Sequence, residues 1–235
     1  MSNFKNMVKR VLYGKPKDPS EEYVARLRGM GMRIGQRTTF FAPHSCVIDE
    51  SRPWLIEIGD DVQVTYGVTI LTHGYDWAVL KGLYGDILGS AGKVTIGNNV
   101  FIGMHSTILK GVTIGDNVII GAGSLVNKDI PNNCVVAGSP ARVIMSLEEY
   151  HEKRKDAQLE EARELVREYR TVFGKDPDEK ALSEFFWLFT ADPSQVTDPS
   201  WIAQMQNLGN QQLSNRVLAE HTPLFRDMQD FLDHC

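Results

Sequence analysis

The stretch "VTIGNNVFIGMHSTILKGVTIGDNVIIGAGSLV", residues 94–126, repeats with a period of six residues. A β-branched aliphatic residue stands at every sixth position, and the set is Ile96, Ile102, Ile108, Ile114, Ile120 and Val126. An α-helix turns by about 100° per residue, so steps of six would spread these side chains around its axis. Turn-forming groups such as "GNN" and "GDN" recur between them. The period therefore predicts a solenoid of very short strands, each followed by a corner.

Looser copies of the period precede this stretch. They are Ile34, Phe40 and Cys46, and then Ile58, Val64 and Ile70. The repeats thus span residues 31–145, and we expect residues 1–30 to form an N-terminal helical segment. Residues 146–235 contain no hexads and predict a helical appendage, with helices over 147–169, from Pro177 and from Thr222. The aromatic cluster "FFWLF", residues 185–189, is expected to pack the core of the appendage or to cap the solenoid rather than to bind a cofactor.

Composition excludes several classes of protein. The 235 residues fit one large domain or a domain with an appendage, and 42% hydrophobic residues can bury a core. A net charge of −5 gives no electrostatic reason to bind nucleic acid. No apolar run approaches the length of a membrane helix, and the N-terminus does not read as a secretory signal. Three widely spaced cysteines predict neither disulfides nor a zinc site, which favours a cytoplasmic location.

The period breaks at one histidine. Ile70 still keeps the six-residue spacing, His73 lies three residues after it, and the next hexad begins only near Val94. Residues 74–93 do not fit the repeat and predict a protruding loop, which on a compact scaffold is usually functional. A histidine on a rigid element at the foot of such a loop suits a general base near neutral pH, although a polar corner residue without a task fits the position equally well.

Two further stretches carry a family resemblance. "THGYDW", residues 72–77, and "IGAGSLVNKDIPNNCVVAGSPARVI", residues 120–144, together with the hexads, resemble the hexapeptide-repeat acetyltransferases. The resemblance is closest to the sugar, capsule-polysaccharide and xenobiotic O-acetyltransferases. It implies an all-β core, a left-handed parallel β-helix of about four coils. It also implies acetyl-CoA as acyl donor, and a homotrimer in which the loop of one subunit reaches the next.

The same resemblance assigns roles to residues. His73 would be the catalytic base that takes a proton from an acceptor hydroxyl, or amine, during direct transfer. The residues that would bind the cofactor are Met104, Ala122, Gly123, Asn127, Lys128, Gly138 and Arg142. Asn127 departs from the family's usual threonine, and Met145 stands where some members carry an arginine. Ordinary solvated charge is the other explanation for Lys128 and Arg142.

The acceptor is the least determined part of the prediction. The expected acceptor-binding residues are His44, Asp49, Tyr66 and Trp77. His105 occupies a corner of the repeat, where it would line the cofactor groove or simply lie on the surface. A sugar or glycan hydroxyl, of the capsule or exopolysaccharide type or of a small saccharide, is the expected acceptor.

Other functions stay open at this point. A xenobiotic or amino-sugar acetyltransferase would use the same scaffold. A non-enzymatic solenoid used in assembly would not need His73, the loop or the segment "AGSPARVI". A carbonic anhydrase of hexapeptide type would need three histidines on zinc. The position at which His105 would need a second histidine is occupied by Lys110.

Overall fold

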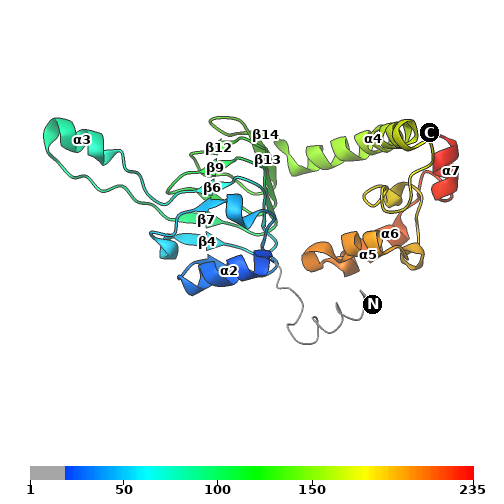
Figure 1. Ribbon diagram of the computed structural model, residues 1–235, viewed down its shortest axis with the longest axis horizontal. Coiled ribbons are helices and arrows are strands. Elements are labelled where there is room, and N and C mark those ends of the chain that lie inside the picture. The colour runs from blue at the N-terminus through cyan, green and yellow to red at the C-terminus, as the bar shows by residue number, and fades with distance from the viewer. Residues whose placement is uncertain (1–18) are drawn as a thin grey trace, which may run out of the picture. The chain divides into compact units, whose positions relative to one another are not determined.

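The computed structural model describes residues 19–235, except the side chain of Asn207 (Figure 1). The predicted N-terminal helical segment therefore lies outside the described residues as far as residue 18. The chain divides into two compact units, of which the first ends at Glu148 and the second is Glu149–Cys235.

The first unit is a parallel β-helix with three sheets of short strands. The first sheet consists of β1 (Arg33–Ile34), β4 (Ile56–Ile58), β7 (Val94–Ile96) and β10 (Thr113–Ile114). The second consists of β2 (Thr39–Phe40), β5 (Gln63–Val64), β8 (Val100–Ile102), β11 (Val118–Ile120), β13 (Cys134–Ala137) and β14 (Arg142–Ser146). The third consists of β3 (Val47–Ile48), β6 (Thr69–Ile70), β9 (Thr107–Ile108) and β12 (Leu125–Val126). Neighbouring strands are parallel except β14, which pairs antiparallel with β13, and this arrangement fits the left-handed β-helix that the family resemblance implied.

The aliphatic residue of each hexad points into the core and stacks on its counterpart in the next coil. In the first sheet Ile96 pairs with Ile58 on one side and with Ile114 on the other. All three side chains are at most 2% exposed. Burying one such side chain stabilises the fold by about 1.5–3 kcal/mol, so the stack holds neighbouring coils in register.

Left-handed backbone makes the corners that follow the first sheet. The residues there with φ between 54° and 58° are Arg37, Asp61, Asn99, Asn117 and Asn133. Asparagine and aspartate adopt this conformation more readily than other residues that carry a Cβ atom. The asparagine amides also bond along the ladder, Asn99 Nδ2 to Asn117 Oδ1 at 2.9 Å and Asn117 Nδ2 to Asn133 Oδ1 at 2.8 Å. These contacts explain the recurring "GNN" and "GDN".

Helix α2 (Pro19–Gly29) packs on the first coil. Leu27 is fully buried in the core of the repeat, and the rings of Tyr23 and Phe40 meet edge to face at 5.0 Å. Arg26 holds α2 to the coil through both carboxylate oxygens of Glu50, at 2.7 and 2.9 Å. The helix thus covers apolar side chains that the first coil would otherwise expose.

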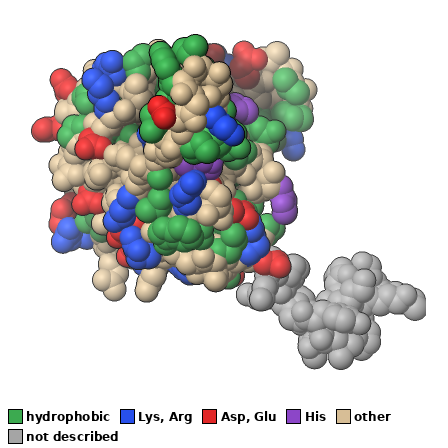
Figure 2. All heavy atoms as spheres, turned by 90° about the vertical axis from the view of Figure 1, so that its left-hand side faces the viewer, with side chains coloured by type: hydrophobic (Ala, Val, Ile, Leu, Met, Phe, Trp, Pro, Cys, Tyr) green, Lys and Arg blue, Asp and Glu red, His purple; other side chains and the backbone are tan. Residues whose placement is uncertain are grey.

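Residues 74–93 leave the repeat as an arm, in the place where the sequence predicted a loop. One full coil separates Thr107 from its partner Leu125 by 18 residues. The coil that contains the arm separates Thr69 from its partner Thr107 by 38 residues, and the 20 additional residues are the arm. It carries a helix that the sequence analysis did not foresee, α3 (Trp77–Tyr84), which has no buried residue. Figure 2 views the repeat unit from the side of the arm, and hydrophobic side chains lie exposed on this face.

The second unit is helical. Its helices are α4 (Leu147–Phe173), which begins at the end of the first unit, α5 (Pro199–Gln206), α6 (Gln211–Glu220) and α7 (Met228–Asp233). Short 3₁₀ helices of the chain are η1 (Pro43–Ser45), η2 (Pro53–Leu55), η3 (Phe186–Leu188), η4 (Pro193–Gln195) and η5 (Asn207–Gly209). The aromatic cluster packs a core of this unit's own, where the ring of Phe186 stacks on Trp201 at 5.2 Å.

Two expected helices of the appendage were wrong. The segment after Pro177 forms turns and η3, and the indole of Trp201 donates at 2.8 Å to the carbonyl of Glu179. The last helix begins at Met228 rather than near Thr222. The backbone N–H of Phe225 donates to the carbonyl of Leu188 instead of entering a helix. Tertiary hydrogen bonds therefore override the local start signals at both places.

Gly103→Ala tests the tight stacking of coils. An added Cβ would lie 2.5 Å from the backbone nitrogen of Ala122 and 2.7 Å from the carbonyl oxygen of Ile120. We expect the free energy of unfolding to fall by about 1–3 kcal/mol in chemical denaturation. Gly82→Ala in α3 is the matched control, since an added Cβ there meets nothing within 4 Å and alanine favours a helix. Equal stability of the two variants would contradict the close stacking.

Candidate active site

The predicted site residues gather on the two corners that flank the third sheet. Asp49 follows β3 directly, and His73 follows its neighbour β6 by three residues. Because Ile48 pairs with Ile70, the side chains of Asp49 and His73 lie at the same corner. The arm starts there, and its base is closed by an antiparallel bridge between His73 and Ala91 and by a 2.9 Å bond from Gly92 N to Thr72 O.

Asp49 accepts hydrogen bonds on both carboxylate oxygens. Oδ1 receives the hydroxyl of Ser51 at 2.6 Å and its backbone N–H at 3.0 Å. Oδ2 receives the backbone N–H and the hydroxyl of Thr72, and it lies 2.6 Å from Nδ1 of His73. Burial alone would raise the pKa of Asp49, but the hydrogen bonds from Ser51, Thr72 and His73 outweigh it and hold this pKa well below its ordinary value. The carboxyl group is therefore a buried anion.

This position corrects the prediction that Asp49 contacts the acceptor. Its side chain is 4% exposed, and its oxygens are engaged by the donors just named. Asp49 instead lies behind His73 and holds the imidazole. The hexads had placed Cys46 opposite Ile70, whereas the structure pairs Ile48 with Ile70 and puts Asp49 beside Leu71. The roles of Ser51 and Thr72 as donors had no signal of their own in the sequence.

His73 is held through one of its two ring nitrogens. Its side chain is 29% exposed, and Nδ1 faces the carboxylate of Asp49. A carboxylate can only accept, so Nδ1 carries the proton and Nε2 keeps its lone pair. Among the described residues none forms a hydrogen bond with Nε2. The arrangement gives an oriented imidazole, and in its neutral form the lone pair of Nε2 can accept a proton.

The other corner brings together small residues expected to bind the cofactor. Gly123 N donates to Met104 O at 2.7 Å, and Leu125 N donates to Gly138 O at 2.9 Å. Ala122 and Gly123 are exposed there, so backbone is accessible along successive coils. Tyr66 is on the same corner, where its ring meets that of His105 at 5.2 Å. The structure thus groups Tyr66, expected at the acceptor, with the expected cofactor residues.

The remaining expected residues are spread over both corners and the arm. Asn127 and Lys128 follow β12 and are exposed on the corner of His73, two coils further on. Arg142 is exposed beside the last strand of the third sheet, because Ala141 N donates to Leu125 O at 2.8 Å. His44 lies exposed in η1, where the hydroxyl of its neighbour Ser45 accepts from Gly67 N. Trp77 opens α3, with its ring 4.9 Å from that of Tyr75.

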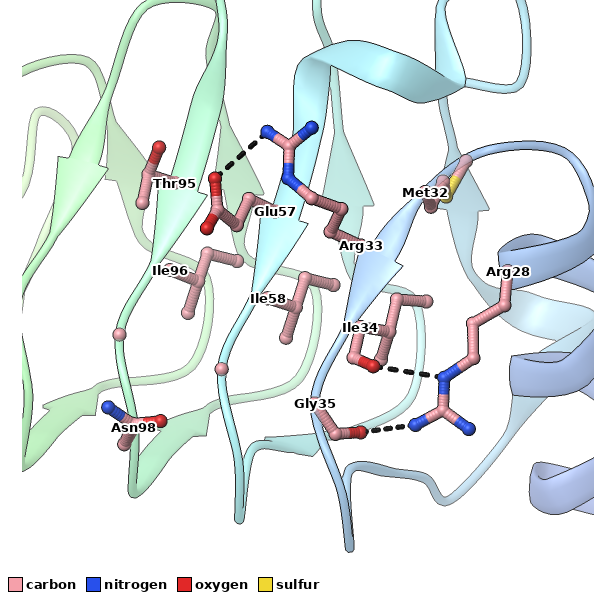
Figure 3. A pocket seen from close by; sticks show the side chains of 12 residues that line it. Arg28, Met32, Arg33, Ile34, Gly35, Glu57, Ile58, Thr95, Ile96 and Asn98 are labelled. Atoms are coloured by element: carbon pink, nitrogen blue, oxygen red, sulfur yellow. Dashed lines mark hydrogen bonds and ion pairs between the residues drawn. The ribbon is translucent and has the colours of Figure 1, made fainter.

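A separate hollow of about 570 Å³ lies along the first sheet (Figure 3). Ile34, Ile58 and Ile96 lie on three adjacent strands there. Its charged groups already have partners. Glu57 bonds Arg33 and Lys93, and Arg28 donates to the carbonyls of Ile34 and Gly35. None of the expected site residues lines this hollow, and we assign it no part in the site.

Comparison with known proteins agrees with the geometry. The family model described as bacterial transferase hexapeptide (six repeats) matches residues 93–128. Protein CapG of Staphylococcus aureus is 43% identical over 128 residues, which are 54% of this chain and 73% of CapG. The chain belongs to the hexapeptide-repeat acyltransferase family.

Two further proteins are similar to part of this chain. The galactoside O-acetyltransferase of Escherichia coli (strain K12) is 39% identical over 119 residues, 51% of this chain and 56% of that protein. The chain thus spans little more than half of that relative. A maltose O-acetyltransferase structure from Clostridium difficile 630 has 29% identity and a TM-score of 0.38, over 61% of this chain and 84% of that one.

The described residues contain neither a helix suited to cross a membrane nor a cluster of metal ligands. None of the helices in residues 19–235 combines the length and the apolar character that crossing a bilayer requires. Within the same residues, no group of three or more His, Cys, Asp and Glu side chains is placed to hold a metal ion.

The low pKa of Asp49 predicts a specific loss of stability in acid. A carboxyl with a depressed folded-state pKa stabilises fully above its unfolded value of about 4, and that contribution is lost as the pH falls toward the folded-state pKa. Urea denaturation of the wild type and Asp49→Asn should show a stability difference that shrinks between pH 7 and pH 3. Ser51→Ala, which removes the side-chain donor to Oδ1, should reduce the acid sensitivity in part. A difference independent of pH would contradict the ionised, hydrogen-bonded carboxylate.

Proposed function

We propose that the chain transfers the acetyl group of acetyl-CoA to a hydroxyl of a sugar or glycan, with His73 as general base. The observation that carries the proposal is the 2.6 Å contact between His73 Nδ1 and the buried carboxylate of Asp49, at the base of the arm. A base oriented in this way, with an Nε2 that none of the described residues engages, has no evident use in a purely structural solenoid.

The chemistry follows from the two nitrogens of the imidazole. The acceptor hydroxyl gives its proton to Nε2 of His73 as its oxygen attacks the thioester carbonyl. The tetrahedral adduct then expels the CoA thiolate, and the imidazolium returns the proton to this sulfur. Asp49, 2.6 Å from Nδ1, stabilises the imidazolium that exists between these steps and keeps the ring in the productive tautomer. The products are an acetyl ester and free CoA, and no acyl-enzyme is formed.

The donor is proposed to lie along the third sheet between its two corners. Accessible backbone at Ala122, Gly123 and Gly138 suits the extended pantetheine arm, which can bond to N–H and C=O groups there. Lys128 and Arg142 supply cations for its phosphates, and the guanidinium offers a bidentate fork. Transfer of an acetyl group agrees with the galactoside O-acetyltransferase among the relatives.

A homotrimer is proposed to complete the site. Helix α3 of the arm buries none of its residues, and Val79, Leu83 and Tyr84 are 70–74% exposed. Apolar surface of this kind is usually covered by a partner. A second copy of the chain is the proposed cover, with the arm of one subunit alongside the His73 of the next.

The acceptor class is tested by a screen. Purified protein is mixed with acetyl-CoA and single acceptors, and thiol release is followed over galactosides, maltose, oligosaccharides and hydroxylated antibiotics. Release with sugars supports the proposal, and release only with antibiotics would favour a xenobiotic acetyltransferase. Calorimetric titration with CoA is the companion measurement, since no binding at millimolar ligand would favour a non-enzymatic module.

His73→Ala is expected to lower turnover by about 10²- to 10⁴-fold, the range that a positioned base contributes. Because His73 is partly exposed and packs no core, the variant should stay folded, with a melting temperature lowered only by the loss of its contact with Asp49. It should also keep the wild-type mass in light scattering, about three times 26.4 kDa. The kcat for the best acceptor of the screen is the quantity to compare.

The control is His234→Ala, which removes an exposed histidine from the helical unit. It should leave kcat unchanged. Full activity of His73→Ala would overturn its assignment as the base, and a wild-type mass of one chain would overturn the proposed trimer.

A further inference from the structure

The helical unit contains a cleft of about 810 Å³ that the proposed reaction does not use. One wall is the start of α4, with Arg154, Lys155 and Gln158. The end of α6 and the residues that follow it line another side of the cleft, and the segment around η3 forms its floor. A volume of this size lies within the range of about 300–1,000 Å³ that is typical of small-ligand sites.

The sequence explains why the cleft stays open. The buried residues of α4 are Ala162 and Val166, in its second half, where the helix packs on the core of the unit. The first turns read "LEEYHEKRKDAQ", residues 147–158, and hold too few apolar residues to form a stripe. This part of α4 therefore passes the aromatic cluster without packing against it, and leaves the rings accessible.

The floor of the cleft is apolar and fixed in place. Phe185 and Trp187 are half-buried and line it together with Leu188. The ring of Trp187 contacts that of Phe186 at 5.6 Å. His221 lies 6.1 Å from the same indole and bonds the carbonyl of Trp187 through Nε2 at 2.8 Å. Trp187 is thus held from two sides and keeps part of its surface open to the cleft.

The charges of the cleft do not suit an anion. Arg154 is bound through two nitrogens to the carboxylate of Glu161, at 2.7 and 2.5 Å, and Lys155 is bound to Glu152 at 2.9 Å. These cations are already neutralised. Glu184 and Glu220 line the cleft and have no ion pair among the described residues. The groups left to meet a ligand are therefore two carboxylates, the imidazole of His151 and the polar side chains of Gln158 and Thr222.

An aromatic floor with a rim of acceptors and donors matches the chemistry of a sugar. A pyranose ring has an apolar C–H face that packs on an indole, and its edge carries hydroxyl groups. Carboxylates, amides and hydroxyls can accept or donate to these hydroxyls. We propose that the cleft binds an uncharged oligosaccharide segment of the acceptor glycan. This inference rests on the proposed function, because it takes the acceptor to be a glycan.

Such a site gives the appendage a role in substrate choice. While one segment of a glycan is bound to the helical unit, the other hydroxyl groups of that glycan stay close to the same protein molecule, which raises their effective concentration there. The acceptor would then be a chain of several sugars rather than a monosaccharide.

The experiment measures glycan binding separately from acetyl transfer. Full-length His73→Ala, which retains the cleft, is titrated by calorimetry with maltohexaose, cellohexaose and chitohexaose, and with a heparin hexasaccharide as the anionic comparison. Trp187→Ala and Glu220→Gln are made in the same background. Phe173→Ala is the matched control, because this aromatic ring is 60% exposed in the same unit and does not line the cleft.

At least one uncharged hexasaccharide should bind at one site per chain and bind more tightly than heparin. Trp187→Ala should weaken it by at least tenfold and Glu220→Gln by several-fold, while Phe173→Ala leaves it unchanged. Circular dichroism should show that all variants are folded, and Glu220, which is exposed, keeps the test open if Trp187→Ala does not fold.

The inference is overturned if none of the three uncharged sugars binds, if heparin binds best, or if Glu220→Gln leaves binding intact. If sugars bind in the cleft but the wild type transfers acetyl to no sugar, the proposed function is wrong and the cleft is still a glycan site. If the wild type transfers acetyl to sugars but none binds in the cleft, the proposed function stands and the cleft proposal is wrong.

Discussion

The stacking of one buried aliphatic side chain on the next is the constraint on which the repeat unit depends. Ile58, Ile96 and Ile114 pair in register across neighbouring coils, and the second and third sheets repeat this arrangement. A side chain fits the narrow interior only if the backbone turns sharply after every strand. Left-handed asparagine and aspartate provide these turns after the first sheet. The register is thereby fixed to the residue, and any additional chain must leave the coil as a protrusion.

The site uses both consequences of this constraint. Because Ile48 and Ile70 are held abreast, the residues just after them meet at one corner, and Asp49 comes within 2.6 Å of His73. The arm departs at the same point, so the partly exposed imidazole of His73 lies at the base of the arm. A buried carboxylate would be costly without partners, but the donors of Ser51 and Thr72 remove that cost and keep it ionised. The scaffold thus orients the imidazole without requiring a flexible side chain to find its place.

The period of six predicted the short strands of the sheets and the boundaries of the arm, since each follows from local spacing, whereas the residues of the small-residue corner came from the family resemblance. The role of Asp49 was not foreseen, because 22 residues rather than 18 separate Val47 from its partner Thr69, and the additional turn with η2 hides the pairing. The helix α3 was not predicted for a different reason. It contains a glycine and buries none of its residues, so its sequence lacks the apolar stripe by which a packed helix is recognised. In the appendage, bonds from Trp201 and Phe225 to distant carbonyls decide where helices fail to form, and no local signal reports them.

The central claim is that Asp49 acts on the reaction only through His73, and a double-mutant cycle in kcat tests it most directly. Asp49→Asn, His73→Ala and the double variant are compared with the wild type on one accepted sugar at saturating acetyl-CoA. The account predicts that the double variant is no slower than His73→Ala alone, because without the imidazole there is nothing left for the carboxylate to orient. Losses that multiply in the double variant would show that Asp49 and His73 act independently, and would contradict it.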